Sequence, residues 1–66
     1  MYEVNARTVR DALLKRGWSL SEFARNANLH DKTCRNLLRG ARVTIKTISI
    51  AANALGVDPD SLILHD

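Results

Sequence analysis

Four residues that readily take a left-handed backbone, Gly17, Asn28, Gly40 and Gly56, interrupt this chain at short intervals. Between them, apolar residues recur at the three- and four-residue spacing that places side chains on one face of an α-helix. A glycine or asparagine in the left-handed region commonly follows the last turn of a helix. The pattern therefore predicts an all-α fold of five short helices, joined by tight turns in a single domain over residues 1–66.

Polar residues suited to N-capping mark where the first three predicted helices begin. Asn5 precedes the first helix, and Ser19 opens the second with Glu22 at the spacing of a capping box. The third helix begins at His30 or Asp31, of which Asp31 is chemically the better cap. We therefore expect Asp31 to cap the third helix.

The last two predicted helices are less regular in composition. Residues 43–48 are rich in β-branched side chains, which favours a strand, but the helical spacing continues to Leu55 and decides for a helix after Thr44. Asp58, followed by a proline, opens a fifth helix of one or two turns. Residues 1–4 fit none of these elements.

Composition limits how so short a chain can be stabilised. A chain of 66 residues buries only about 60% of the surface that it exposes when unfolded, so it needs a second copy, a metal, disulfides or regular helix packing. One cysteine excludes an internal disulfide and, with two histidines, is too small a set for a zinc site, so we expect no metal and no cofactor. The chain has no apolar run of membrane-spanning length and no signal-peptide pattern, which indicates a cytoplasmic location.

Positive charge is concentrated in the middle of the chain. The net charge is +2 over residues 1–20, +4 over residues 21–46 and −3 over residues 47–66. Such a distribution is typical of a protein that binds a polyanion such as nucleic acid. A solvated surface with clustering by chance explains the charge alone equally well.

The third predicted helix has two distinct faces. Cys34 and Leu37 point inward, whereas the residues at i, i+3, i+4 and i+7 form an outward stripe of cations and one amide. Arginine and lysine pair with guanine O6 and N7 in the major groove, and asparagine pairs with adenine N6 and N7. A solvated helix face usually mixes both signs of charge, whereas no acid lies between residues 32 and 46. The stripe, which favours double-stranded DNA as the partner, consists of Lys32, Arg35, Asn36 and Arg39.

Residues 19–40 resemble the helix-turn-helix of lambdoid phage repressor and Cro proteins, the xenobiotic-response-element (XRE) type family. Asn28 stands where that family has a turn glycine, and residues 48–62 look like its fourth and fifth helices. The resemblance covers about residues 5–64. The matching residues of the motif are Glu22, Phe23 and Ala24 in its first helix, Leu29 in its turn, and Thr33, Cys34, Leu37 and Gly40 in and after its second helix.

Three positions depart from the pattern of the family. Leu20 replaces a glutamine that contacts phosphate, so that side-chain contact should be absent, although backbone N–H groups at the same helix start can hold a phosphate. His30 replaces the usual serine cap of the recognition helix. Leu38 replaces a common glutamate near the end of that helix.

The resemblance implies a prokaryotic or phage-encoded repressor that binds an operator with its third helix in the major groove. Asp31 is ambiguous, because capping the helix is a more common role for it than accepting a hydrogen bond from cytosine. Surface solvation is the alternative for Arg42 and Lys46. The residues assigned to base edges are Asp31, Lys32, Arg35 and Asn36, and those assigned to phosphates are Ser21, Thr33, Arg39, Arg42 and Lys46.

Other chemically distinctive residues favour structural roles. Cys34 occupies an aliphatic position and is a packing residue more readily than a redox sensor. Trp18 follows a turn and is expected to cover the core. No pair of carboxylates and no nucleophile with a base occurs at a catalytic spacing, so we expect no enzyme activity.

Apolar residues outside the core stripes predict self-association. Ile50 falls about 200° from Ile48 around a helix and so points away from the core, and Ile63 and Leu64 cannot both join Leu62 inside. We expect a two-fold homodimer through Ile50, Ile63 and Leu64 that reads two half-sites. The alternative is an antitoxin-like protein-interaction module in which DNA binding is secondary.

Overall fold

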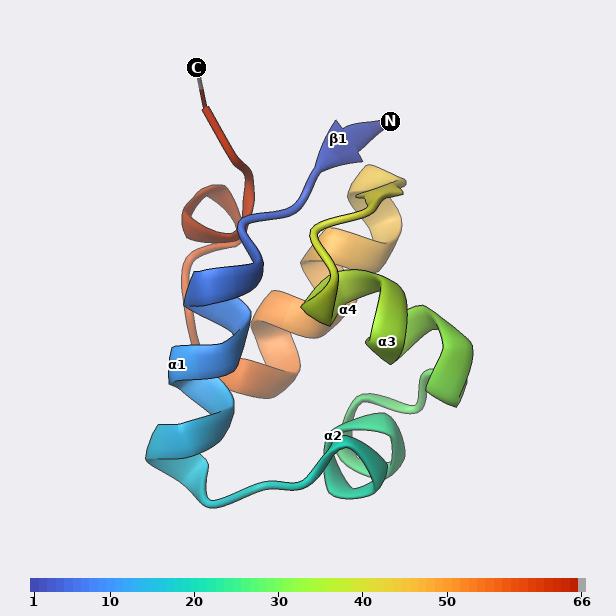
Figure 1. Ribbon diagram of the computed structural model, residues 1–66, viewed down its shortest axis with the longest axis vertical. Helices are drawn as coiled ribbons and strands as arrows, with labels where there is room; N and C mark the ends of the chain where they lie inside the picture. The colour runs from blue at the N-terminus through green and yellow to red at the C-terminus, as the bar shows by residue number, and fades with distance from the viewer. Residues whose placement is uncertain (66) are drawn as a thin grey trace.

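The computed structural model describes residues 1–65 of the chain, which fold into a mainly helical domain (Figure 1). Within these residues there are four α-helices, one 3₁₀ helix and one two-stranded ribbon. The fifth predicted helix is thus a single 3₁₀ turn, and the fold is not purely helical. In chain order the elements are β1 (Tyr2–Glu3), α1 (Ala6–Arg16), α2 (Leu20–Ala27), α3 (Asp31–Leu38), β2 (Arg42–Val43), α4 (Ile45–Leu55) and η1 (Pro59–Leu62).

The capping residues confirm most of the predicted boundaries. Asn5, Ser19 and Thr44 each accept a hydrogen bond from the third amide of the helix that follows. Asp58 accepts from the amide of Asp60 at the start of η1. The left-handed conformations predicted after α1, α2 and α4 are all present. These local signals set the helix ends because each satisfies backbone groups that the helix itself leaves unpaired.

The start of α3 differs from the prediction. His30, with an extended backbone, is the N-cap residue, and its side chain makes no capping hydrogen bond. Asp31 is instead the first helical residue, so the expectation that it caps α3 was wrong. Its carboxylate lies in the first turn, where the partial positive charge of the helix start favours an acid.

The N-terminal residues that fit no predicted element form the ribbon. β1 pairs antiparallel with β2, with Tyr2 opposite Val43 and Glu3 opposite Arg42. The C-terminal segment lies along the other edge of β1, where the amide of Leu64 donates to the carbonyl of Glu3 over 2.8 Å. The ribbon brings the two ends of the described chain together at one end of the molecule, with α2 at the opposite end (Figure 1).

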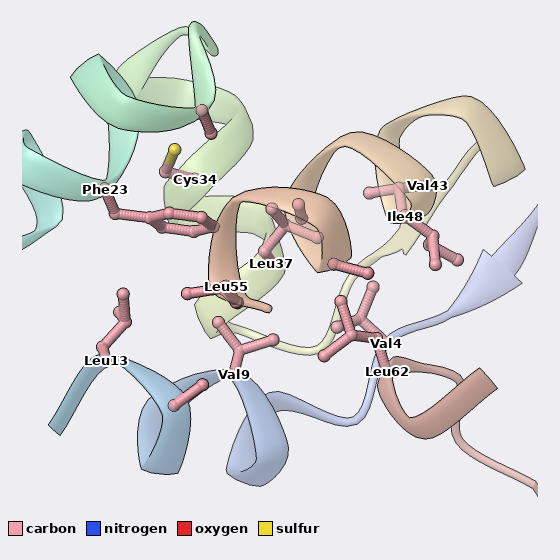
Figure 2. Close-up of a cluster of buried hydrophobic side chains, with 14 of the residues drawn as sticks. Val4, Val9, Leu13, Phe23, Cys34, Leu37, Val43, Ile48, Leu55 and Leu62 are labelled. Atoms are coloured by element: carbon pink, nitrogen blue, oxygen red, sulfur yellow. The ribbon is translucent and has the colours of Figure 1, made fainter. Parts of the chain in front are cut away.

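The core draws apolar side chains from every helix and from the ribbon. Figure 2 shows Phe23 of α2, Leu37 of α3 and Leu55 of α4 directed into one interior. Val4, next to β1, is only 2% exposed and closes the ribbon end of this interior. The core includes no buried polar or charged residue within residues 1–65. Its contacts therefore fix the orientation of α3 through apolar packing alone.

Candidate nucleic-acid interface

Helices α2 and α3 form a helix-turn-helix whose turn is held by backbone hydrogen bonds. Asn28 takes the left-handed conformation at φ 56° and ψ 46°, and its amide donates to the carbonyl of Arg25. The amide of Leu29 donates to the carbonyl of Ala24 over 2.9 Å, and the Leu29 side chain packs against the core. Asparagine replaces glycine here at small cost because it tolerates this conformation better than other non-glycine residues.

Apolar anchors hold both helices of the motif against the rest of the protein. Phe23 and Ala24 of α2 are buried, and Cys34 and Leu37 of α3 are completely buried. Burial raises the pKa of the Cys34 thiol, and the nearby Asp31 carboxylate raises it further. Cys34 is therefore a neutral packing residue at neutral pH, as the sequence predicted.

The opposite face of α3 is turned to solvent. Lys32, Arg35 and Arg39 are exposed, and Asn36 is half-buried at the same surface. None of the four belongs to the core, so the predicted division of α3 into two faces is confirmed. Leu38, in the final turn, packs against the core instead of joining this surface.

Two residues of this surface are joined by a hydrogen bond that the sequence analysis did not predict. The Arg39 Nη2 donates to the Asn36 Oδ1 over 2.8 Å. The only sequence signal for this contact is the i, i+3 spacing, which brings side chains together on a helix. This hydrogen bond orients the Asn36 side chain with its amide oxygen toward Arg39.

The positive charges at this surface face no acidic partner. Within residues 1–65, the one contact between a basic and an acidic side chain joins His65 Nε2 and Asp60 Oδ1 over 3.3 Å in the C-terminal segment. Arg42 on β2 and Lys46 in the first turn of α4 are also exposed, and they extend the positive surface beyond α3. Because no carboxylate in the described part of the chain neutralises these cations, they are available to an external polyanion.

The start of α2 supplies a second set of hydrogen-bond donors. In the capping box, the Ser19 amide donates to the Glu22 carboxylate over 2.8 Å, and the Glu22 amide donates to the Ser19 hydroxyl. Hydrogen bonding to the Glu22 carboxyl, from the Ser19 amide above all and then from the Ser19 side chain, holds its pKa below the ordinary value. The amides of Leu20 and Ser21 have no intrahelical partner at this position, and the Ser21 side chain is exposed.

The first turn of α3 adjoins a shallow hollow that opens on the surface. Leu29, His30 and Asp31 line it, together with Lys32 and Thr33. Asp31 is exposed here and Thr33 is half-buried. Every residue that the sequence assigned to base edges thus lies on α3, and the residues assigned to phosphate lie on or around the same motif.

Comparison with protein-family models agrees with this geometry. The helix-turn-helix family model matches residues 9–62, from α1 to the end of η1. The chain belongs to the helix-turn-helix family. It is a Cro- and repressor-like member, and the family consists of DNA-binding transcription regulators rather than enzymes. Neither the comparison with curated proteins nor that with solved structures found a match.

In this helix-turn-helix protein, the three residues predicted to form the dimer contact differ in their exposure to solvent. Leu64 is 46% exposed, whereas Ile50 and Ile63 are half-buried and pack against the core. The expectation that Ile50 points away from the core was therefore wrong. Helix α4 packs against both α2 and η1. Its buried surface is therefore wider than one helical stripe through Ile48, and it includes part of Ile50. Ile63 is held by its backbone bridge to Val4.

Among the residues described for this helix-turn-helix protein, no helix combines the length and hydrophobicity needed to cross a membrane.

A second contact that the sequence did not predict lies away from α3. The Arg16 guanidinium donates to the Leu55 carbonyl through Nε over 3.0 Å and through Nη2 over 2.6 Å. It also lies 5.1 Å from the centre of the Trp18 ring, which is half-buried against the core as predicted. Arg16 thus connects the ends of α1 and α4 beside the start of the helix-turn-helix.

Proposed function

We propose that this protein is a sequence-specific regulator that binds a double-stranded operator with α3 in the major groove and controls transcription by occupying the promoter. The observation that carries this proposal is the solvent-facing stripe of α3, which has three cations and an amide and no acidic partner among residues 1–65. An α-helix fits the major groove, and these side chains are the ones that read base edges there.

The residues around the stripe have different proposed roles. Lys32, Arg35 and Asn36 contact base edges, and Asp31 is available to accept from a cytosine amino group because it does not cap the helix. The proposed phosphate contacts are Ser21, Thr33, Arg39, Arg42 and Lys46, with the free amides at the start of α2. Phosphate contacts position the protein, whereas base contacts decide which sequence it prefers.

A selection of bound sequences from random duplex DNA tests this function. We expect enrichment of a defined motif, and binding of that motif should weaken steeply with salt, with log K falling by about 0.9 for each neutralised phosphate. Arg35→Ala and Asn36→Ala should each reduce discrimination between specific and random duplex by about 1–3 kcal/mol. Arg42→Ala is the matched control, because it should weaken binding to both duplexes equally. Equal losses on both duplexes for all three variants would reject the division of roles.

We also propose that the protein binds its operator as a two-fold dimer, with half-sites about 34 Å apart. Leu64, supported by the partly exposed Ile50 and Ile63, is the proposed contact. Its amide donates to the Glu3 carbonyl of β1, and β1 lies at the end of the molecule opposite α2 (Figure 1). An exposed apolar residue beside other partly exposed ones is typical of an association surface.

Sedimentation at micromolar concentration tests the dimer. The wild type should sediment as a dimer, alone or on DNA, and Leu64→Glu should sediment as a monomer. Leu14→Glu is the matched control, because Leu14 on α1 is 72% exposed and lies outside the proposed contact. A monomeric wild type in both conditions, or equal effects of the two variants, would reject this interface.

A further inference from the structure

We infer that the central part of α3 presents mainly hydrogen-bond donors to the major groove, and that the protein consequently selects guanine rather than adenine opposite Asn36. This inference deepens the proposed function and rests on it. It concerns the class of base pair that the recognition surface accepts.

The orientation of the Asn36 side chain carries the inference. A guanidinium has only donors, so the Asn36 atom that lies 2.8 Å from the Arg39 Nη2 must be the amide oxygen. The Asn36 Nδ2 group therefore points away from Arg39. Because its oxygen is already engaged by a charged donor, Asn36 offers the groove its two N–H donors.

The backbone around this pair is also held. The carbonyl of Asn36 accepts from the amides of Arg39 and Ala41, over 3.3 and 3.0 Å. These bonds close the last turn of α3 and fix the separation between Asn36 and Arg39. The side-chain pair thus spans a short, well-defined stretch of chain, which favours its persistence when the protein binds.

The neighbouring side chains have the same hydrogen-bonding character. Lys32 and Arg35 lie on the same stripe as Asn36 and have donors but no acceptor. The acceptors of α3 are the Asp31 carboxylate and the Thr33 hydroxyl, which flank the stripe in the first turn. The central stripe is therefore complementary to a run of acceptors.

The hydrogen-bonding groups on the base edges decide which base a donor-rich surface prefers. Guanine presents two acceptors, N7 and O6, in the major groove, whereas adenine presents the N7 acceptor and the N6 amino donor. Asparagine pairs with adenine only when its oxygen is free to accept from N6. With one lone pair of that oxygen held by the positively charged Arg39, the oxygen is a weaker acceptor for the N6 amino group of adenine, whereas N7 and O6 of guanine both meet donors, and guanine is preferred.

Selection and competition experiments with two variants test the inference. The base pair opposite Asn36 is identified as the position of the selected motif at which Asn36→Ala weakens the base preference of the protein. At that position the wild type should prefer guanine over adenine by at least about fivefold, the lower end of discrimination by a good base contact. Arg39→Met frees the amide oxygen and should reduce this ratio to about one or reverse it. Arg42→Met removes an equal charge outside α3 and should leave the ratio unchanged.

A second measurement uses the wild-type protein alone. Replacing the guanine by inosine keeps N7 and O6 and should retain affinity, whereas 7-deazaguanine, which lacks N7, should lose it. A wild-type preference for adenine at this position, or the same guanine preference in Arg39→Met as in the wild type, would overturn the inference and leave the proposed function standing. A wild type with no sequence preference would reject both.

Discussion

Arg16 holds the carboxyl ends of α1 and α4 together through two hydrogen bonds from one guanidinium to the Leu55 carbonyl. The next residue after Leu55 is Gly56, at φ +68°, and a Cβ atom there would lie 2.5 Å from the Arg16 Nη2. Gly17 has nearly the same conformation, at φ +67°, but a Cβ atom there would meet no other atom within 4 Å. The two glycines thus share a backbone requirement and differ in their surroundings.

We predict that Gly56→Ala lowers the free energy of unfolding more than Gly17→Ala does. Both variants pay the cost of a left-handed alanine, about 1–2 kcal/mol. Gly56→Ala additionally displaces Arg16 and loses a charged hydrogen bond, which is worth about 1.5 kcal/mol or more. In an Arg16→Ala background the two glycine variants should cost the same. Denaturant unfolding of the six proteins measures this, and an unchanged difference in that background would contradict the role of Arg16.

The sequence could not predict this contact. Helical spacing puts Arg16 on the same face of α1 as Val9, Ala12 and Leu13, but the acceptor is a backbone carbonyl 39 residues away. The pairing of Arg39 with Asn36 escaped prediction for another reason, since i, i+3 spacing permits a side-chain hydrogen bond without requiring one. Residue type and helix face, by contrast, were sufficient to predict the exposure of the α3 stripe and the burial of Cys34 and Leu37.

At the scale of elements, α2 and α3 begin differently. Ser19 caps α2 through its hydroxyl, whereas His30 gives α3 no side-chain cap. We predict that His30→Ser raises the free energy of unfolding by about 1 kcal/mol and that Ser19→Ala lowers it by about the same amount. Chemical denaturation checks both values. A His30→Ser protein no more stable than the wild type would show that the first turn of α3 obtains its stability elsewhere.

The capping box of α2 also predicts an acid-dependent loss of stability. The Ser19 amide and then its hydroxyl hold the pKa of Glu22 below its ordinary value of 4.5. Because the folded-state pKa is the lower one, this stabilisation is fully present above the unfolded value and is lost as the pH falls through the folded value. When the pH is lowered from 6, the free energy of unfolding should decline less steeply for Glu22→Gln than for the wild type. Glu3→Gln, outside any cap, should follow the wild type; identical slopes in all three proteins would contradict the prediction.

Helices were predictable from the sequence because caps, spacing and terminal glycines are local signals. The ribbon was not, because β1 and β2 have two residues each, too few for an alternating pattern, and they pair across about 40 residues. An isolated bridge next to the ribbon places Val4 opposite Ile63, and Val4 is buried there while Ile63 is half-buried. The start of α3 was predicted wrongly because side-chain preference favoured Asp31 as the cap, whereas the helix begins at Asp31 itself, one residue earlier than such a cap requires.

At the scale of the whole molecule, charge and shape are arranged around one surface. Residues 21–46 have a net charge of +4, and their exposed cations extend from α3 over β2 to the first turn of α4. The C-terminal segment has no lysine or arginine after Lys46. The basic surface can therefore attract DNA, and the proposed dimer contact at Leu64 lies in the part of the chain that has no lysine or arginine.

The central claim is that the solvent-facing stripe of α3 enters the DNA. Backbone amide resonances of the ¹⁵N-labelled protein, followed during titration with the selected duplex, test it most directly. We predict the largest shifts in residues 31–39, with smaller ones at Ser21, Arg42 and Lys46. Saturable binding that leaves the α3 amides at their free positions, with shifts confined to other segments, would contradict it.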